Sequence, residues 1–541
     1  MSLDKNIFPT PEDVPKAYDM PRMDQNHYLI NGEKREWKGS MQDVFSPVMI
    51  RDAAGNLTQK VLGSYPLMDA PSANAALDAA VNAYAKGCTG NYWPDFPVEQ
   101  RIEHMETFIK KMSETRTPVV NYLMLEIGKS YTDACKEFDR TVQYIKDTVD
   151  ELRYMNRKST WMKEEGIHAK KGRASLGTTL VMGPYNYPLN ETFTTLIPAL
   201  LMGNTAVMKP AKYGVLLHEP LLNAYKESFP AGVINTVYGD GASIIQPMMK
   251  SGKVDVLAFI GGANTVNKYI LPFHPNPAHL EAILGLNAKN PGIVLKHSDR
   301  KTAVKEGTAG SLSFNGQRCT ALKMFFVHES IAEEFAADLA SSIDNLVWGM
   351  PWTTGANITP LPDLGMVKNM ESYVTDALSK GAKLVNPKGG QSVGTFFAPA
   401  VLFGVKPNMR IYNEEQFGPV VPIVTFSDIT EPIKYMIDSD FGQQASIFGN
   451  NPAEVGKLVD VAFKQVCRTN LNGQCMRGPD KYPFTGRKSS AKKVLSIRDA
   501  LEAFSLPSLF AAPDNEENRK LIQEMIKGGH SKYLSAGCYP S

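Results

Sequence analysis

Residues 177–212 decide the fold and read GTTLVMGPYNYPLNETFTTLIPALLMGNTAVMKPAK. Their pattern predicts a short apolar strand at Thr179–Met182, an apolar helix at Leu189–Met202 and a second strand at Thr205–Met208. A strand, a helix and a strand in this order form a βαβ unit, in which the two strands are parallel. Because such sheets bind ligands at the carboxyl ends of their strands, the turns after the two strands are candidate binding segments.

The same alternation extends through most of the chain. Upstream, apolar residues at helical spacing predict helices over Arg101–Ser113, Pro118–Glu126 and Asp133–Met155. Downstream we expect helices at Val215–Ser228 and Ser243–Lys250, and strands at Val233–Tyr238 and Val254–Ile260. A second series, from about Ile293 to Leu471, includes the helix Ile331–Leu346 and the strands Lys323–Val327, Ala400–Leu402 and Val420–Thr425. We therefore predict an α/β protein with two doubly wound domains and a cleft between them.

Bulk composition narrows the possible function classes. The chain has 541 residues, more than one hydrophobic core organises, and a formal net charge of +2. A nucleic-acid or membrane-surface partner would require a clustered basic excess, so neither is expected. The six cysteines are scattered without a CxxC pair, which argues against a disulfide framework or a metal site and favours a reducing compartment. Without a visible signal peptide or membrane-spanning apolar run, the sequence predicts a cytoplasmic protein.

One cysteine has an unusual setting. Cys319 lies in the polar segment Phe314-Asn315-Gly316-Gln317-Arg318-Cys319-Thr320, between two apolar stretches. The positive charge of Arg318 would favour the nucleophilic thiolate. Asn186, in the turn after the first strand quoted above, would supply an amide donor for an oxyanion. The pair predicts aldehyde oxidation through a thioester.

The candidate cofactor site lacks the dinucleotide fingerprint GxGxxG. Gly261 and Gly262 follow a predicted strand and open a helix, where backbone N–H groups could approach a pyrophosphate, although such a glycine pair is more often a plain turn. Lys209 and Lys212 follow the strand Thr205–Met208. They could hold a ribose and an added 2′-phosphate, or they could be solvated loop lysines.

Four motifs in order resemble those of the aldehyde dehydrogenase superfamily, over roughly residues 40 to 505: Gly183–Pro188, Gly203–Pro210, Gly316–Cys319 and Glu414–Pro419. The resemblance implies a Rossmann-like cofactor domain and a catalytic domain, with Cys319 as nucleophile and Asn186 as oxyanion donor. It also implies a set of cofactor contacts: Pro184, Tyr185, Lys209, Lys212, Gly241, Gly261, Gly262, Glu415 and Phe417. NAD-dependent members often carry a glutamate where this chain has Lys212. A lysine would attract a 2′-phosphate that a carboxylate repels, so NADP is the expected cofactor.

Other positions resemble the non-phosphorylating glyceraldehyde-3-phosphate dehydrogenases of the superfamily. These are Glu126–Ser130 with Arg140 downstream, Arg318 before the nucleophile, and Met476–Asp480. The resemblance implies that Arg140, Arg318 and Arg477 bind a substrate phosphate, with Thr320 also contacting the substrate. A guanidinium suits this role because it pairs bidentately with phosphate oxygens, although each arginine alone would more often be a surface or ion-pair residue. The expected substrate is a small phosphorylated aldehyde.

One segment departs from the superfamily pattern. Gly285 stands where the general base is usually a glutamate, and the candidate catalytic residue beside it is Asn287, whose amide cannot accept a proton at neutral pH. Three interpretations remain open: a variant subfamily with its base elsewhere, a chain engineered at Asn287 to deacylate slowly, or acyl transfer to coenzyme A, as in members such as methylmalonate-semialdehyde dehydrogenase. A non-catalytic member is a fourth alternative, opposed by the joint presence of Cys319, Asn186, Lys209 and Glu415.

The resemblance also divides the chain. We expect an extended N-terminal arm at 1–40, a cofactor-binding domain at 41–157 and 174–290, a catalytic domain at 291–484 and a bridging segment at 158–173 and 485–541. In the bridging segment, Lys158–Arg173 should associate with Arg487–Phe504, because strand-like residues surround Val494–Ile497. Positional analogy implies that this segment joins subunits into a homodimer or homotetramer.

Overall fold

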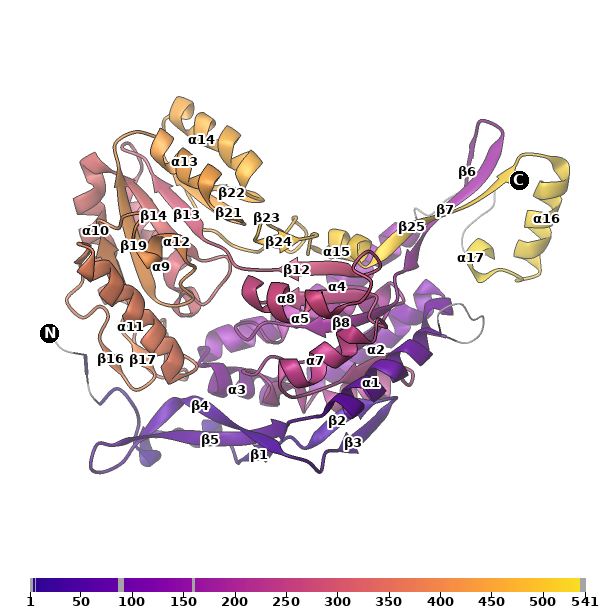
Figure 1. Ribbon diagram of the computed structural model, residues 1–541, viewed down its shortest axis with the longest axis horizontal. Coiled ribbons are helices and arrows are strands. Elements are labelled where there is room, and N and C mark those ends of the chain that lie inside the picture. Colours follow the sequence, from indigo (N-terminus) through magenta and orange to yellow (C-terminus); the bar gives the residue numbers. More distant parts are fainter. Residues whose placement is uncertain (1–2, 5, 86–91, 158–160, 536–541) are drawn as a thin grey trace.

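The first domain is built on a six-stranded sheet in the order β10-β9-β8-β11-β12-β24 (Figure 1). The computed structural model describes residues 3–4, 6–85, 92–157 and 161–535. The parallel strands of this sheet are β8 (Thr178–Met182), β9 (Thr205–Met208), β10 (Ile234–Thr236), β11 (Val256–Ile260) and β12 (Glu281–Gly285). The helices α5 (Asn190–Leu201) and α7 (Gly241–Lys250) connect successive strands. The strand order changes direction at β8 and β11, which is where doubly wound sheets bind ligands.

The second domain is built on a seven-stranded sheet in the order β15-β18-β19-β14-β13-β21-β22. Its parallel strands are β13 (Asn290–Val294), β14 (Leu322–His328), β18 (Ala400–Phe403), β19 (Val420–Phe426), β21 (Gln444–Phe448) and β22 (Arg468–Leu471), while β15 (Lys383–Leu384) is antiparallel. Its helices include α9 (Arg300–Leu312), α10 (Glu329–Asp344), α11 (Leu364–Ser379), α13 (Thr430–Asp438) and α14 (Pro452–Gln465). The predicted α/β fold with two doubly wound domains is confirmed.

The helices upstream of the first sheet also agree with the sequence pattern. They are α1 (Ala70–Tyr84), α2 (Val98–Glu114), α3 (Arg116–Ile127) and α4 (Tyr131–Arg157). The helix expected over Val215–Ser228 is instead divided into η4 (Leu216–His218) and α6 (Leu222–Ser228). Pro220 lies between them and has no backbone N–H to donate to the preceding turn. In the part of the chain that the structure describes, no helix combines the length and the apolar character needed to cross a bilayer.

The N-terminal segment is not the extended arm that its composition suggested. It contains β1 (Met23–Asp24) and a hairpin of β2 (His27–Ile30) and β3 (Glu33–Glu36), and β1 pairs with β5 (Leu57–Pro66). The backbone N–H groups of Leu29 and Asn31 donate to Thr236 Oγ1 and Asn235 Oδ1, both at 2.9 Å. Such contacts fix the segment against the end of β10. A long hairpin of β4 (Met41–Arg51) and β5 follows it along the base of the molecule (Figure 1).

The C-terminal segment returns to the first domain and then projects away from it (Figure 1). β24 (Ala491–Lys492) joins the first sheet antiparallel to β12, and β25 (Ser505–Pro513) pairs with β7 (Ile167–Ser175), which pairs with β6 (Trp161–Glu164). The predicted partner, Arg487–Phe504, is therefore wrong. Residues 494–496 lead into α15 (Ile497–Ala503), and the pairing strand follows it. Residues 158–160 of the predicted hairpin lie outside the described residues.

Candidate active site

A cavity of about 760 Å³ lies between the two domains. The first domain contributes the turn after β8, the glycines after β11 and the segment after β12, and the second contributes the Cys319 turn and residues 415 and 417. All but two of the residues predicted for the site line this cavity: Arg140, Pro184, Tyr185, Asn186, Lys212, Gly261, Gly262, Asn287, Arg318, Cys319, Thr320, Glu415, Phe417 and Arg477. Segments far apart in the sequence thus meet where the sheet topology predicts a ligand.

Lys209 and Gly241 lie outside the cavity wall. Lys209 directly follows β9, where its ammonium Nζ donates to the carbonyl of Pro210 at 3.0 Å and burial lowers its pKa to about 8. Gly241 is the first residue of α7, whose N-terminus is capped by the carboxylate of Asp240. The roles of Lys209 and Gly241 as cofactor contacts remain predictions.

An unusual backbone turn presents Cys319. Phe314, Asn315 and Gly316 have φ angles of 50°, 56° and 71°, so three successive residues adopt the left-handed region. The Asn315 side chain stabilises the turn by donating to the Thr359 carbonyl and accepting from its N–H, both at 3.0 Å. A Cβ on Gly316 would lie 2.7 Å from a backbone oxygen, so only glycine fits there. Strained backbone of this kind is concentrated at functional sites.

The Cys319 thiol is held in its protonated form at neutral pH. Burial, together with the negative charges of Glu191 and Glu415, raises its pKa to about 11. The expectation that Arg318 favours the thiolate is wrong, because its guanidinium turns away to donate to two backbone carbonyls of α9. Arg477 is the arginine whose charge lowers this pKa, and its effect is smaller than that of burial.

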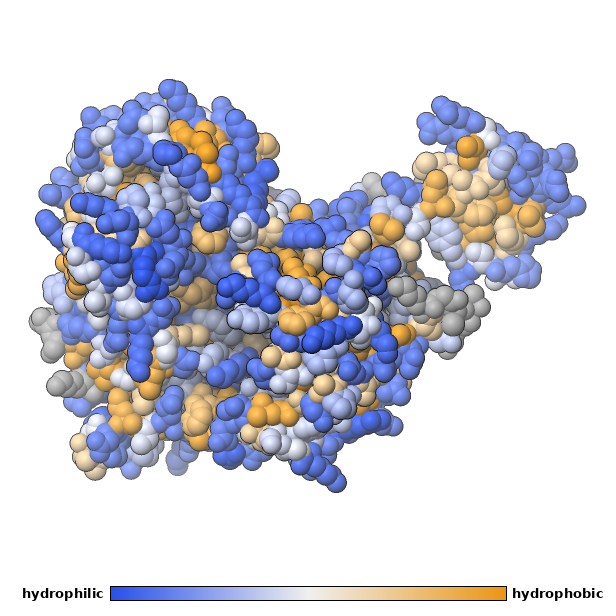
Figure 2. All heavy atoms as spheres, viewed as in Figure 1, coloured by the Kyte–Doolittle hydropathy of each residue, from blue (hydrophilic) through white to orange (hydrophobic). Residues whose placement is uncertain are grey.

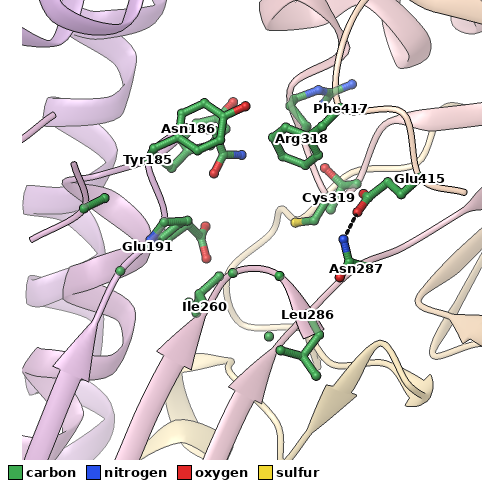
Figure 3. A pocket seen from close by; sticks show the side chains of 18 of the residues that line it. Tyr185, Asn186, Glu191, Ile260, Leu286, Asn287, Arg318, Cys319, Glu415 and Phe417 are labelled. Atoms are coloured by element: carbon green, nitrogen blue, oxygen red, sulfur yellow. Dashed lines mark hydrogen bonds between the residues drawn. The ribbon is translucent and has the colours of Figure 1, made fainter. Parts of the chain in front are cut away.

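Asn186 faces Cys319 across the cavity (Figure 3). Its amide Nδ2 donates to the Gln317 carbonyl at 2.8 Å, which fixes the side chain next to the cysteine turn. An amide nitrogen has two hydrogens, so a second donor remains for a substrate oxygen. The arrangement therefore has a sulfur nucleophile opposite a fixed N–H group.

Three buried residues that the sequence analysis did not assign support these two side chains. Lys129 donates to the Asn186 carbonyl at 2.8 Å and pairs with Glu137, whose carboxylate accepts the N–H groups of residues 189 and 190 at the start of α5. Asn290 donates to the Cys319 carbonyl at 2.8 Å. The segment Glu126–Ser130 was noted for its resemblance, but its contact with Asn186 depends on tertiary structure.

Asn287 bridges the two domains at the other end of the cavity. Its Nδ2 donates to Glu415 Oε2 at 2.6 Å (Figure 3), and its Oδ1 accepts the N–H of Ala263, the first residue of α8 (Ala263–Tyr269), at 2.8 Å. Both ends of the amide are therefore occupied. Glu281, the nearest carboxylate in this segment, begins β12 and pairs with Lys493 at 3.1 Å.

This end of the cavity fits a nicotinamide dinucleotide. Burial raises the pKa of Glu415, and its Oε1 has no hydrogen-bond partner among the described residues. Such an oxygen can accept a ribose hydroxyl. The rings of Tyr185 and Phe417 pack edge to face at 5.8 Å, and Lys212 in the same cavity wall is suited to a 2′-phosphate.

The three predicted phosphate-binding arginines reach the cavity, but two are already paired. Arg140 binds Asp480 through two hydrogen bonds, of 3.0 and 2.6 Å. Arg477 pairs with both Asp480, at 3.3 Å, and Glu191. Burial alone would raise the pKa of Asp480, yet the two arginines hold it below its ordinary value. Among the described residues, Arg318 has no carboxylate within 4.0 Å.

The fold and the cavity have the architecture of a thiol-dependent dehydrogenase, and the sequence profile of the aldehyde dehydrogenase family matches residues 51–508. The chain belongs to the aldehyde dehydrogenase family. It is 29% identical over 488 residues to the NADP-dependent glyceraldehyde-3-phosphate dehydrogenase of Streptococcus equinus, which covers 88% of this chain and 96% of that protein. It is 28% identical over 407 residues to the 3,6-anhydro-alpha-L-galactose dehydrogenase of Vibrio sp. (strain EJY3), covering 74% of this chain and 83% of that protein.

A solved structure extends the comparison to three dimensions. The NADP-dependent glyceraldehyde-3-phosphate dehydrogenase from Bacillus halodurans C-125, complexed with NADP, superposes with a TM-score of 0.80 at 29% identity. The match covers 91% of this chain and 100% of that chain.

Proposed function

We propose that the protein oxidises glyceraldehyde 3-phosphate to 3-phosphoglycerate with NADP, through a thioester on Cys319. The observation that carries this proposal is the presence of Arg140, Arg318 and Arg477 in the same cavity as Cys319. The names of the Streptococcus and Bacillus relatives support the substrate and the cofactor. Lys212 in the cavity wall supports NADP over NAD.

In the proposed reaction the Cys319 sulfur loses its proton to solvent water and attacks the aldehyde carbon. The Asn186 amide and the backbone N–H of Cys319 hold the resulting oxyanion. When bound, NADP supplies the acceptor for the hydride that leaves the same carbon. Loss of the hydride gives a thioester, and water then attacks its carbonyl carbon to release the acid and restore the thiol.

A phosphate would bind at the arginine end. Arg318 contributes a guanidinium with no carboxylate partner among the described residues, and Arg140 and Arg477 contribute N–H groups that their carboxylates leave unused. Three guanidinium groups against two carboxylates, Asp480 and Glu191, leave one excess positive charge, which favours an anionic substrate group over a cationic one.

Reduction of NADP with glyceraldehyde 3-phosphate tests the proposal, with unphosphorylated glyceraldehyde as the matched substrate. We expect NADPH formation in the absence of both coenzyme A and inorganic phosphate, and a higher kcat/KM for the phosphorylated substrate. Equal kcat/KM values for the two substrates would contradict the proposed phosphate site.

Acyl transfer to coenzyme A is a second candidate, favoured by Gly285 in the cavity wall at the place of the usual general base. In that case steady-state NADPH formation depends on added coenzyme A, and the product is a thioester rather than a free acid. The same assay, repeated with and without coenzyme A, separates the two functions.

A further inference from the structure

Glu191 is a carboxylate in the cavity wall that the proposed reaction does not yet use. It is the second residue of α5, and its side chain is 9% exposed. Figure 3 shows it pointing into the cavity from the wall opposite Cys319. The negative charge of Glu191 raises the pKa of the Cys319 thiol more than the negative charge of Glu415 does. The carboxylate therefore lies within electrostatic reach of the carbon that the sulfur would attack.

The position of this carboxylate is fixed from behind. Its Oε2 pairs with Arg477, and its Oε1 accepts from Asn190 Nδ2 at 3.3 Å. Arg477 is itself held by the Leu495 carbonyl at 2.9 Å and lies over the ring of Phe484, 4.4 Å from its centroid. A carboxylate has about four lone-pair sites and these contacts use two, so Glu191 can still accept a hydrogen bond from the cavity.

The surrounding charges indicate what kind of donor fits. An ammonium group would approach a region in which Arg140, Arg318 and Arg477 outnumber the two carboxylates, so a cationic substrate is disfavoured. A neutral hydroxyl avoids that repulsion and can donate to the remaining lone pairs. A hydroxyl on the carbon next to the aldehyde would have its oxygen two bonds away from the carbon attacked by Cys319. Glyceraldehyde 3-phosphate has a hydroxyl at this position.

We propose that Glu191 accepts a hydrogen bond from the 2-hydroxyl of the substrate and so selects 2-hydroxyaldehydes. The inference rests on the proposed oxidation at Cys319, but not on the phosphate contacts. A site with a buried, fixed acceptor discriminates against an analogue without the hydroxyl, because the analogue leaves that acceptor desolvated and unpaired.

The decisive comparison uses lactaldehyde and propanal, which differ only in the 2-hydroxyl, with 3-hydroxypropanal as the positional control. For the unmodified protein we expect kcat/KM for lactaldehyde to exceed that for propanal by about 10- to 100-fold, the range for a hydrogen bond to a charged group. 3-Hydroxypropanal should have a kcat/KM like that of propanal.

Two variants of Glu191 test its role directly. Glu191→Leu should bring the lactaldehyde-to-propanal ratio of kcat/KM close to one. Glu191→Gln keeps an acceptor oxygen without the charge and should give an intermediate ratio.

Asp480→Asn is the matched control variant. It removes the other carboxylate on Arg477, but Asp480 does not line the cavity, so the lactaldehyde-to-propanal ratio should stay near that of the unmodified protein. Thermal unfolding establishes that each variant is folded, and Glu191→Gln, which is nearly isosteric, serves if Glu191→Leu does not fold.

Three results would overturn the proposal. The first is a ratio near one in the unmodified protein, and the second is a ratio that neither Glu191 variant changes. The third is an equal loss of turnover for both substrates with the first equivalent of NADPH still released rapidly, which would make Glu191 a base in thioester hydrolysis. A failure of the phosphate proposal would be recognised separately, as equal kcat/KM values for glyceraldehyde 3-phosphate and glyceraldehyde.

Discussion

The thiol of Cys319 ionises less readily than an ordinary cysteine, because burial and two neighbouring carboxylates raise its pKa to about 11. Below its pKa, the thiolate fraction rises about tenfold per pH unit. Alkylation of Cys319 by iodoacetamide should therefore still accelerate between about pH 8.5 and 10, where an exposed cysteine peptide levels off. Mass spectrometry of the Cys319 peptide measures the rate. A rate that levels off by about pH 9.5, as that of an ordinary thiol does, would show that the thiol is not held in this way.

The two side chains that face each other across the cavity should differ in how much activity their loss removes. Cys319→Ser should abolish NADPH formation, since no other thiol lines the described cavity. Asn186→Ala should lower turnover by about 10²- to 10³-fold, the usual effect of removing one oxyanion donor. Stopped-flow absorbance of NADPH measures both. A Cys319→Ser protein with near-normal rates would exclude the thioester route.

The arginines are unequal probes of the phosphate. Arg477→Ala would leave the buried Glu191 without its partner, so its effect on substrate cannot be separated from its effect on folding. Arg140, whose side chain is 34% exposed, is the better probe. Arg140→Ala should lower kcat/KM for glyceraldehyde 3-phosphate by about one to two orders of magnitude and hardly change that for glyceraldehyde. An equal loss with both substrates would assign Arg140 to structure.

Most of the residues that sequence reasoning assigned to the site line the cavity, but their pairing was not predicted. Cys319, Asn186 and Glu415 stand in recognisable motifs, whereas Glu191 sits in an apolar helix with no local signal of its role. Its partner Arg477 comes from the second half of the chain, and that contact exists only after the two domains meet. Whether an arginine is free for substrate depends on such tertiary contacts, which motif matching does not give.

At the scale of elements, the carboxyl group of Glu126 near the end of α3 joins that helix to η4. It accepts the N–H groups of Val215 and Leu216 at 2.7 and 3.0 Å, and burial raises its pKa to about 8. Between its ordinary value of 4.5 and about 8, the folded protein keeps a proton that the unfolded chain has lost. This group's contribution to the free energy of unfolding is therefore complete below pH 4.5 and falls as pH rises to about 8.

Glu126→Gln should remove that dependence. The free energy of unfolding of the variant, relative to the unmodified protein, should rise between pH 5 and 8, by at most about 1.4 kcal/mol per pH unit. Urea unfolding at several pH values measures it. A difference that stays constant over this range would contradict the assignment.

The strand that sequence analysis misplaced shows where local pattern is insufficient. β25 contains Pro507 and Pro513, which argue against a strand, but among the described residues it pairs on one side only, with β7. A proline is tolerated there because an edge strand leaves alternate N–H groups without a partner strand. The parallel strands that the sequence pattern did predict include β11 and β18, which are continuous apolar runs that are mostly buried.

At the scale of the whole molecule, the projecting sheet of β25, β7 and β6 exposes apolar side chains. Leu506 and Leu509 are 59% and 63% exposed, and Figure 2 shows apolar atoms gathered on the projecting unit.

We expect the protein to be a dimer or tetramer joined through this sheet. Replacing both leucines by Asp should give a monomer by light scattering at micromolar concentration. Phe463→Asp, at a 75% exposed position on α14, is the control and should leave the mass unchanged. A monomeric unmodified protein would count against the proposal.

The return of the C-terminal segment to the first domain has a consequence for biosynthesis. β24 completes the first sheet beside β12, and β25 completes the projecting sheet beside β7, although β7 and β12 are translated long before them. The two closing strands therefore emerge from the ribosome only when translation is almost finished. Until release, the edges of β7 and β12 can pair with strands of other chains. Nascent chains of this protein should therefore need chaperones to cover these edges late in synthesis. A premature stop codon anywhere before residue 491 would leave both edges unpaired for good.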